Sequence, residues 1–236
     1  MHKVTSNGPT KPVYQHDGQL CILDTRVISC EPISTFSEID RALFKSAKDE
    51  DLIVQTAETI FYAQGGGQPS DVGIMTLPAS TTFNVTSVRN ASEGRILHCG
   101  HFSAASPSSE IGNSVEVKQS IDVELRRLHS RIHTAGHVLG LAMRSLVSDG
   151  TIPLLNGLSG LEEGKAQHYP NSAWVECRVD PAVNLAQYKD AIQARTTELV
   201  ERDLPVKICF WSFKEAVGKC AVSPAELGMG EGDTVR

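Results

Sequence analysis

The sequence predicts an α+β protein in which a small β-barrel is followed by an α+β domain with two helices over an antiparallel sheet. Short β-type runs separated by Asn, Ser, Gly and Pro turns fill the chain up to about residue 118. Two stretches with helical spacing follow them. We therefore expect a flexible N-terminal arm at 1–19, a barrel domain at 20–118 and the α+β domain at 119–236.

The predicted strands of the barrel are short and rich in Val, Ile and Leu, with a helical turn between the second and third at 36–48. A run that ends at Tyr62 leads directly into three consecutive glycines. The expected strands are Leu20–Leu23, Arg26–Cys30, Leu52–Gln55, Thr59–Tyr62, Phe83–Val88, Arg95–His98 and Val115–Lys118.

The second half carries its strongest helical period at 125–146, where apolar residues recur every three or four positions. Ser120 or Asp122 can cap this helix. A glycine-rich connection at 150–164 is expected to follow, then a strand at 173–179 and a second helix that begins at Pro181 and runs to about Arg202. The last predicted elements are a strand at 205–211 and a helical turn at 213–217.

The composition is that expected of an ordinary soluble protein: 40% of the 236 residues are hydrophobic. No apolar run approaches the roughly 18 residues needed to cross a bilayer, and residues 1–17 lack the apolar core of a signal peptide. We therefore expect no membrane partner and a cytoplasmic location. The 6 cysteines form no C-x-x-C pair and are expected to be reduced thiols.

The net charge of −6 argues against an extensive nucleic-acid-binding surface, which normally shows an excess of basic residues. Any contact with RNA is then expected to be local. Four arginines give the predicted central helix a basic flank that can meet phosphates, although a solvated face is the more frequent explanation of such a pattern. They are Arg126, Arg127, Arg131 and Arg144.

His133 and His137 lie four residues apart in the predicted central helix, so their imidazoles project side by side about 5 to 6 Å apart at Cβ. Two ligands of one metal ion have this spacing, and a solvated polar face is the alternative. No Glu follows the first histidine, which excludes a thermolysin-like protease. Gly136 and Gly140 leave room for another segment to approach this side of the helix closely.

Three consecutive glycines, Gly65, Gly66 and Gly67, occur in the segment from Phe61 to Gly73. Glycine is favoured where the chain turns sharply or where a ligand touches the backbone. A phosphate-binding loop is excluded, because its spacing and its Gly-Lys-Ser/Thr ending are missing. A hairpin turn and a ligand-contacting loop both remain open.

Together the two motifs resemble a known family. The pattern F-Y-x-x-G-G-G-Q-P-S-D-x-G, followed some 60 residues later by R-x-x-H-S-x-x-H-T-A-G-H-V-L, is similar to the editing domain of alanyl-tRNA synthetase and its free-standing AlaX relatives. The resemblance covers roughly residues 20–236. It implies that the first half is the family's β-barrel and the second its zinc-binding editing domain, which threonyl-tRNA synthetase shares.

The resemblance also implies a function. Members of the family hydrolyse the ester that joins a wrong Ser or Gly to the tRNA for alanine, and free-standing members do so in trans. Carried onto this chain, His133 and His137 are expected to bind Zn²⁺. Thr134 and the loop residues Gly65, Gly66, Gly67 and Gln68 are expected to border the substrate, where a glycine wall limits room for larger side chains.

The family completes its zinc site with a Cys-x-x-x-His element, which is expected just beyond Val235-Arg236 and so is not in the given sequence. Zinc sites use three or four protein ligands, and Cys177, His168 and Cys220 are the candidates for a third, Cys220 being poorly placed. The family also has a polar residue on the loop after its helix. Its candidates here are Asn156, Ser159, Gln167 and His168.

Two other functions remain open from the sequence. One is an enzyme derived from this family that acts on a small amino-acid derivative in specialised metabolism, which the acidic charge favours slightly. The other is a non-catalytic binding module that keeps the fold.

Overall fold

The computed structural model describes most of the chain and divides it into two compact units, 1–198 and 199–236, which we describe separately. The described residues are 8–103, 114–153, 161–178, 182–220, 229–230, 232 and 234–235.

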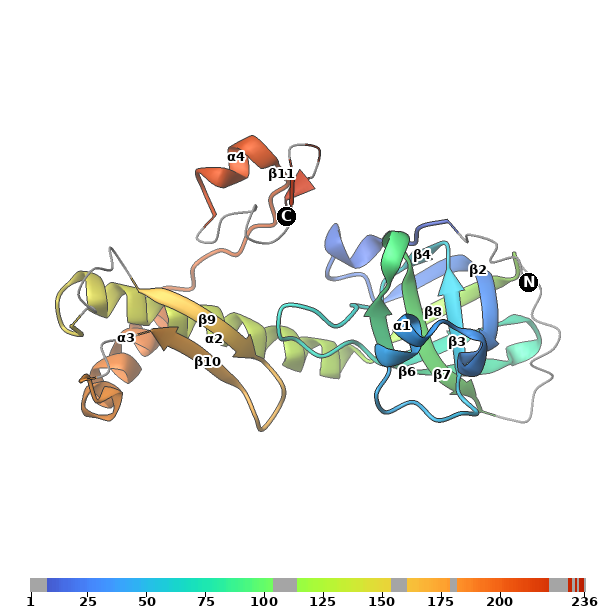
Figure 1. Ribbon diagram of the computed structural model, residues 1–236, viewed down its shortest axis with the longest axis horizontal. Coiled ribbons are helices and arrows are strands. Elements are labelled where there is room, and N and C mark those ends of the chain that lie inside the picture. The colour runs from blue at the N-terminus through green and yellow to red at the C-terminus, as the bar shows by residue number, and fades with distance from the viewer. Residues whose placement is uncertain are drawn as a thin grey trace. The chain divides into compact units, whose positions relative to one another are not determined.

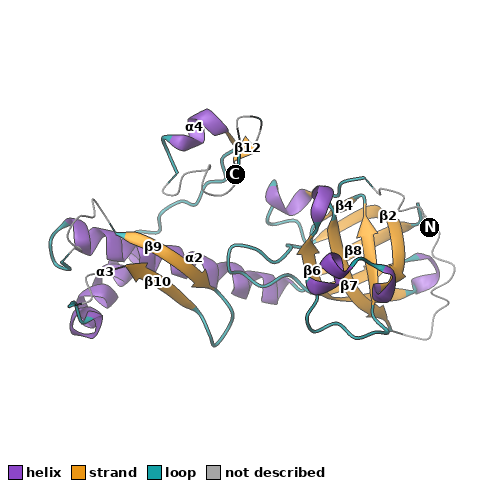
Figure 2. Cartoon of the chain, viewed as in Figure 1, coloured by secondary structure: helices purple, strands orange, loops and turns teal. Residues whose placement is uncertain are grey.

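The first half of the larger unit is a closed β-barrel, shown with its strands in Figures 1 and 2. Its strands follow one another in the order β2-β3-β7-β6-β5-β8, and every neighbouring pair is antiparallel. This confirms the predicted fold class. The strands are β2 (Ile22–Pro32), β3 (Leu52–Thr56), β5 (Gly73–Thr76), β6 (Thr82–Asn90), β7 (Ile96–Phe102) and β8 (Glu116–Ile121).

Three details of the barrel differ from the sequence prediction. The strands expected at Leu20–Leu23 and Arg26–Cys30 are one continuous strand, β2, because Asp24 and Thr25 between them also pair with β8. β5 was not expected, because a run of four residues after a glycine is too short to show alternation. The run expected at Thr59–Tyr62 is a strand only in β4 (Glu58–Thr59), after which the chain leaves the ladder toward the glycine loop. Short helices complete this half: η2 (Ile33–Thr35), α1 (Glu38–Ala42), η3 (Pro78–Ser80) and η4 (Ser92–Gly94).

The N-terminal segment packs onto the barrel. β1 (Lys11–Pro12) pairs with β4, and η1 (Val13–Gln15) brings Tyr14, which is 5% exposed, into the main core cluster. Its ring lies 5.4 Å from that of Tyr62 in an edge-to-face arrangement. The expected flexible arm at 1–19 is therefore wrong for the described residues from 8 onward, because an aromatic side chain anchors them.

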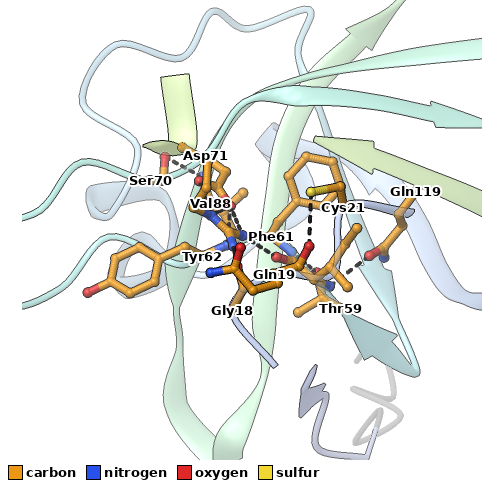
Figure 3. Close-up of polar contacts among 12 residues, drawn as sticks. Gly18, Gln19, Cys21, Thr59, Phe61, Tyr62, Ser70, Asp71, Val88 and Gln119 are labelled. Carbon is orange, nitrogen blue, oxygen red and sulfur yellow. Dashed lines mark hydrogen bonds and ion pairs between the residues drawn. The ribbon is translucent and has the colours of Figure 1, made fainter. Parts of the chain in front are cut away.

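Polar side chains are buried in the barrel only where they find partners. Gln119 accepts a hydrogen bond from the Ile60 N–H at 3.0 Å, and the Phe61 N–H donates to the Thr59 hydroxyl at 3.0 Å (Figure 3). His98 is fully buried and lies 2.8 Å from that same hydroxyl and 3.0 Å from the Val54 carbonyl oxygen. These bonds offset the cost of removing the polar groups from water.

The long helix α2 (Val123–Ser148) begins directly after the barrel. The Asp122 carboxylate caps it by accepting a hydrogen bond from the Leu125 N–H at 2.9 Å, whereas Ser120 belongs to β8. Gly150 follows its end with φ of +79°, a conformation that favours glycine. The predicted helix at 125–146 thus forms and is two residues longer at each end.

A two-stranded antiparallel sheet and a further helix complete the α+β half. Met143 and Leu146 of α2 form an apolar cluster with Ile152, against which Cys177 and Ile192 pack. This cluster joins the two helices to the sheet, as the sequence predicts. The elements are β9 (Glu162–Gln167), β10 (Trp174–Arg178), η6 (Leu185–Tyr188) and α3 (Lys189–Glu201).

Two predictions in this half are corrected. Residues 162–164 belong to β9 and not to a connection, because backbone pairing with β10 makes them a strand although their side chains do not alternate. The second helix is not continuous from residue 181: a 3-10 turn, capped by Asn184, precedes α3. Pro181 itself lies outside the described residues.

The smaller unit pairs β11 (Trp211–Ser212) with β12 (Thr234–Val235), and α4 (Phe213–Val217) follows β11 with a Ser212–Glu215 capping box. The predicted helical turn at 213–217 is confirmed. The predicted strand at 205–211 is wrong up to Phe210, because its alternating apolar residues Val206 and Ile208 are exposed and pair with no strand among the described residues. Across the described residues, no helix is long and apolar enough to cross a membrane.

The buried histidine of the barrel predicts acid sensitivity. Burial lowers the pKa of His98 to about 4, although its bond to Val54 opposes this shift. The unfolded chain takes up the proton near pH 6.5, so the contribution to stability is complete above that pH and falls as the pH drops toward 4. We expect a loss of about 3 kcal/mol across this window, measured by urea unfolding at stepped pH.

Two variants isolate the contribution of His98. The pH dependence should flatten in His98→Asn, whereas His101→Gln, which changes an exposed histidine of β7, should keep the wild-type slope. An equal slope in wild type and His98→Asn would show that another group controls acid unfolding.

Candidate active site

The glycine loop is a tight hairpin turn. Gly65 and Gln68 exchange backbone hydrogen bonds of 3.3 and 2.9 Å, and Gly66 and Gly67 have φ of +54° and +76°. Positive φ at both central residues is the signature of a type I′ turn, which strongly favours glycine. The Tyr62 hydroxyl donates to the Gly65 carbonyl oxygen at 3.0 Å and stiffens the turn. Of the two alternatives left open by the sequence, the hairpin turn is present, and contact with a ligand stays a prediction.

The tip of this turn touches both other parts of the site. A Cβ on Gly66 would lie 3.4 Å from His133 Cε1, and a Cβ on Gly67 would lie 2.5 Å from the Ala166 carbonyl oxygen. The His168 N–H donates to the Gly67 carbonyl oxygen at 2.9 Å. The loop is thus a turn and also a wall against which α2 and the end of β9 pack closely.

Three imidazoles gather where these elements meet. The ring centroids of His133 and His137 are 4.9 Å apart at an interplanar angle of 25°, and His168 stacks on His133 at 4.5 Å and 19°. A Cβ on Gly136 would come within 2.3 Å of His168 Cε1. The expectation that something approaches this face of the helix is confirmed, and the approaching group is His168.

The environment of His133 and His168 favours the neutral form of both imidazoles. Burial is the main cause that lowers the pKa of His133 to about 4, and His168 and His137 lower it further. Burial, and then His137, also lowers the pKa of His168. His133 Nδ1 lies 2.9 Å from Gln68 Oε1, an acceptor, so Nδ1 carries the proton and Nε2 keeps its lone pair. A neutral imidazole in a fixed tautomer is the form that binds metal ions.

These residues fit a zinc ion in donor type. Gly66 leaves space at the edge of the His133 ring that a side chain would fill, since its Cβ would lie 3.8 Å from Nε2. Among the described residues, however, no group of three or more His, Cys, Asp or Glu side chains is arranged to hold a metal.

The other predicted site residues are more dispersed. Thr134 is exposed and is not among the residues that line the pocket described below. Cys177 packs against the apolar cluster of α2, and burial is the main cause that raises the pKa of its thiol. Cys220 follows α4 in the smaller unit. Asn156 and Ser159 lie outside the described residues.

A pocket of ≈ 680 Å³ opens between the glycine loop, α2 and the β9–β10 hairpin. It contains His133, His137 and His168 together with one acidic residue, Glu163, which sequence reasoning missed because β9 was not predicted. The Gly140 position next to Glu163 was the signal available in the sequence. The lining residues are Gln64, Gly66, Gly67, His133, Gly136, His137, Glu163, Gly164, Lys165, Ala166, Gln167, His168, Tyr169, Trp174 and Val175.

A buried ion pair joins the glycine loop to α2. The Arg126 guanidinium donates to both oxygens of Asp71, whose side chain is 0% exposed, and to the Ile60 carbonyl oxygen at 2.6 Å. Asp71 also accepts from the Tyr62 N–H at 2.7 Å, and both residues are drawn in Figure 3. Both oxygens of the carboxylate thus accept hydrogen bonds, as a buried charge requires.

The predicted basic flank of α2 is largely neutralised by such pairs. Arg126 is bound to Asp71, Arg127 to Glu124 at 2.9 Å and Arg144 to Glu163 at 2.9 Å. Three of the four arginines named from the sequence are therefore engaged with carboxylates.

The sequence is similar to proteins that are named for alanyl-tRNA. An alanine–tRNA ligase of Haloquadratum walsbyi is 32% identical over 201 residues, which cover 85% of this chain and 19% of the ligase. One of Nocardioides sp. is 30% identical over 187 residues, covering 79% of this chain and 19% of the ligase. The alanyl-tRNA editing protein AlaX-M of Pyrococcus horikoshii is 29% identical over 153 residues, or 64% of this chain and 60% of AlaX-M. No family model matches the chain.

The barrel, the glycine turn and the paired histidines are thus those of a protein related to alanine–tRNA ligases, of whose length the chain spans about a fifth. The chain belongs to the family of alanyl-tRNA synthetase editing domains and AlaX-type editing proteins.

Removing the charge of Asp71 should destabilise the protein strongly. In Asp71→Asn the Arg126 guanidinium, whose side chain is 11% exposed, stays buried without its counter-ion. We expect a loss of about 3 to 5 kcal/mol in the free energy of unfolding, measured with urea. Glu124→Gln is the control, since its pair with Arg127 is exposed and should cost less than about 1 kcal/mol. Equal losses in both variants would contradict a structural role for the buried pair.

A side chain on Gly67 should disturb the contact between the glycine turn and β9. In Gly67→Ala the new Cβ would collide with the backbone of Ala166 and hold an alanine at positive φ, so β9 must move. We expect a loss of about 1 to 3 kcal/mol and faster hydrogen exchange of the His168 amide. Gly65→Ala, whose Cβ would have no neighbour closer than 3.8 Å, should leave both unchanged. Unaltered exchange in Gly67→Ala would refute the contact.

Proposed function

We propose that this protein is a trans-acting aminoacyl-tRNA deacylase that hydrolyses the ester joining a mischarged Ser or Gly to the tRNA for alanine, with Zn²⁺ as its cofactor. The observation that carries the proposal is the meeting of two distant motifs in one pocket, where Gly66 faces His133. The names of the relatives, alanine–tRNA ligase and alanyl-tRNA editing protein, support tRNA as the partner. Such a protein would act in the cytoplasm.

The pocket suits an ester of a small amino acid. His133 and His137 would hold the zinc ion, and His168 is a third imidazole within reach of the first. A bound zinc ion would supply Lewis-acid polarisation of the ester carbonyl or a water of lowered pKa. Gln68 orients His133 through Nδ1, as partners of metal-binding histidines commonly do.

The glycine turn supports selectivity for small side chains. Its backbone approaches His133 without any side chain in between, so the wall of the pocket is rigid and close. A wall of this kind excludes larger substrates by overlap with the backbone, which cannot move aside as a side chain can. This favours Ser and Gly over larger amino acids.

A second candidate is hydrolysis of a small amino-acid derivative that carries no tRNA. The net charge of −6 and the engagement of Arg126, Arg127 and Arg144 with carboxylates favour it, because they reduce the attraction to phosphates. A binding module without catalysis is the third candidate.

The test measures metal content and deacylation together. Wild type should carry about one zinc ion per chain and release Ser and Gly from the tRNA for alanine. His137→Ala should lose both the metal and about 100-fold or more of the activity, since loss of a direct ligand exceeds loss of an outer partner. His101→Ala, an exposed histidine of the barrel, is the matched control and should retain both.

Three outcomes separate the candidates. Zinc-loaded wild type that leaves seryl-tRNA intact would reject the deacylase. Turnover of serine methyl ester with none of the tRNA would select the small-molecule enzyme. Unchanged properties of His137→Ala, with no zinc in wild type, would select the binding module.

A further inference from the structure

Glu163 occupies a distinctive place in the pocket. It comes from β9 and lies over Gly140, one helical turn beyond His137, where a Cβ would sit 2.6 Å from its Oε1 atom. Its side chain is 27% exposed and lines the same pocket as the three histidines. The glycine therefore lets a carboxylate reach the helix backbone at the far end of the pocket.

The carboxylate is held by one partner and keeps one oxygen available. Arg144 Nη1 lies 2.9 Å from Oε1 in an ion pair, which fixes the orientation of the Glu163 side chain. Within the described part of the chain, no donor is hydrogen-bonded to Oε2. A carboxylate on the pocket wall, with one oxygen that accepts no hydrogen bond from the described residues, is a site for a hydrogen-bond donor that carries positive charge.

The neighbouring residue shows that this arrangement is not general to the strand. Glu162 is also paired with an arginine, Arg178, at 2.8 Å, but the two side chains are 48% and 67% exposed and neither lines the pocket. Among the described residues that do line it, Glu163 carries the only carboxylate. Two adjacent Glu–Arg pairs therefore differ in whether they face the candidate substrate.

We propose that Glu163 is a specificity-determining residue that binds the α-ammonium group of an aminoacyl substrate. This inference rests on the proposed function and names the part of the substrate that the pocket reads. The ester carbonyl would lie at the histidines and the ammonium at Oε2. Substrates of the right size without the ammonium, such as hydroxyacyl or N-acylated esters, are then disfavoured.

The test uses two non-hydrolysable ligands that differ only in the group in question. Both are amides of 3′-amino-3′-deoxyadenosine. One carries L-serine on the 3′-amino group, and the other carries glyceric acid, in which a hydroxyl replaces the ammonium. Binding of each to the full-length protein is measured by calorimetry at pH 6.5, where the α-amino group is protonated. Wild type should prefer the seryl ligand by about tenfold to a hundredfold.

Glu163→Gln should lose this preference by binding the seryl ligand more weakly and the glyceryl ligand about as before. Glu162→Gln, the matched control on the same strand, should keep it. A merely structural role for the Glu163–Arg144 pair would weaken both ligands equally and overturn the proposal. Absence of a preference in wild type, or failure to bind either ligand, would also overturn it. Deacylation of seryl-tRNA by wild type, measured in parallel, shows in each case whether the proposed function itself stands.

Discussion

The buried pair between Arg126 and Asp71 is the contact on which the arrangement of the site depends. Asp71 follows the glycine turn by a few residues, and Arg126 precedes His133 by about two helical turns. Because the guanidinium also binds the Ile60 carbonyl oxygen, it ties the segment that enters the loop and the segment that leaves it to one helix. The turn is thereby fixed where Gly66 can face His133, although the two residues are far apart in the sequence.

The second constraint on the site is close packing against glycines, which have no side chain. Gly67 on the loop and Gly136 and Gly140 on α2 each mark a place where β9 or His168 comes closer than a Cβ would allow. The three positions lie on two elements that Arg126 holds together, and the β9–β10 hairpin packs closely against both of them. Close packing against backbone leaves little freedom to adjust, which suits a site that must hold groups in a defined geometry.

Local patterns in the sequence predicted the elements whose cause is local. The period of α2, its cap at Asp122 and the turn at Gly66 follow from spacing and backbone preference, and all three are found. Features that depend on distant partners were not predictable. β9 has polar residues along its length and is a strand because β10 pairs with it, so Glu163 went unnoticed. Conversely, the alternation of Val206 and Ile208 predicted a strand, but no strand among the described residues pairs with this segment.

The charge distribution bears on how any substrate of this pocket is chosen. The chain is acidic, and Arg126, Arg127 and Arg144 are already engaged with carboxylates. Long-range attraction to a polyanion is therefore weak, and it would in any case not distinguish one acyl group from another. Discrimination must arise at short range, from the glycine wall that limits size and from the few polar groups inside. With the His133 imidazole, whose pKa burial lowers, at one end and the Glu163 carboxylate at the other, the pocket would, on our proposal, distinguish the two ends of a small polar molecule by charge.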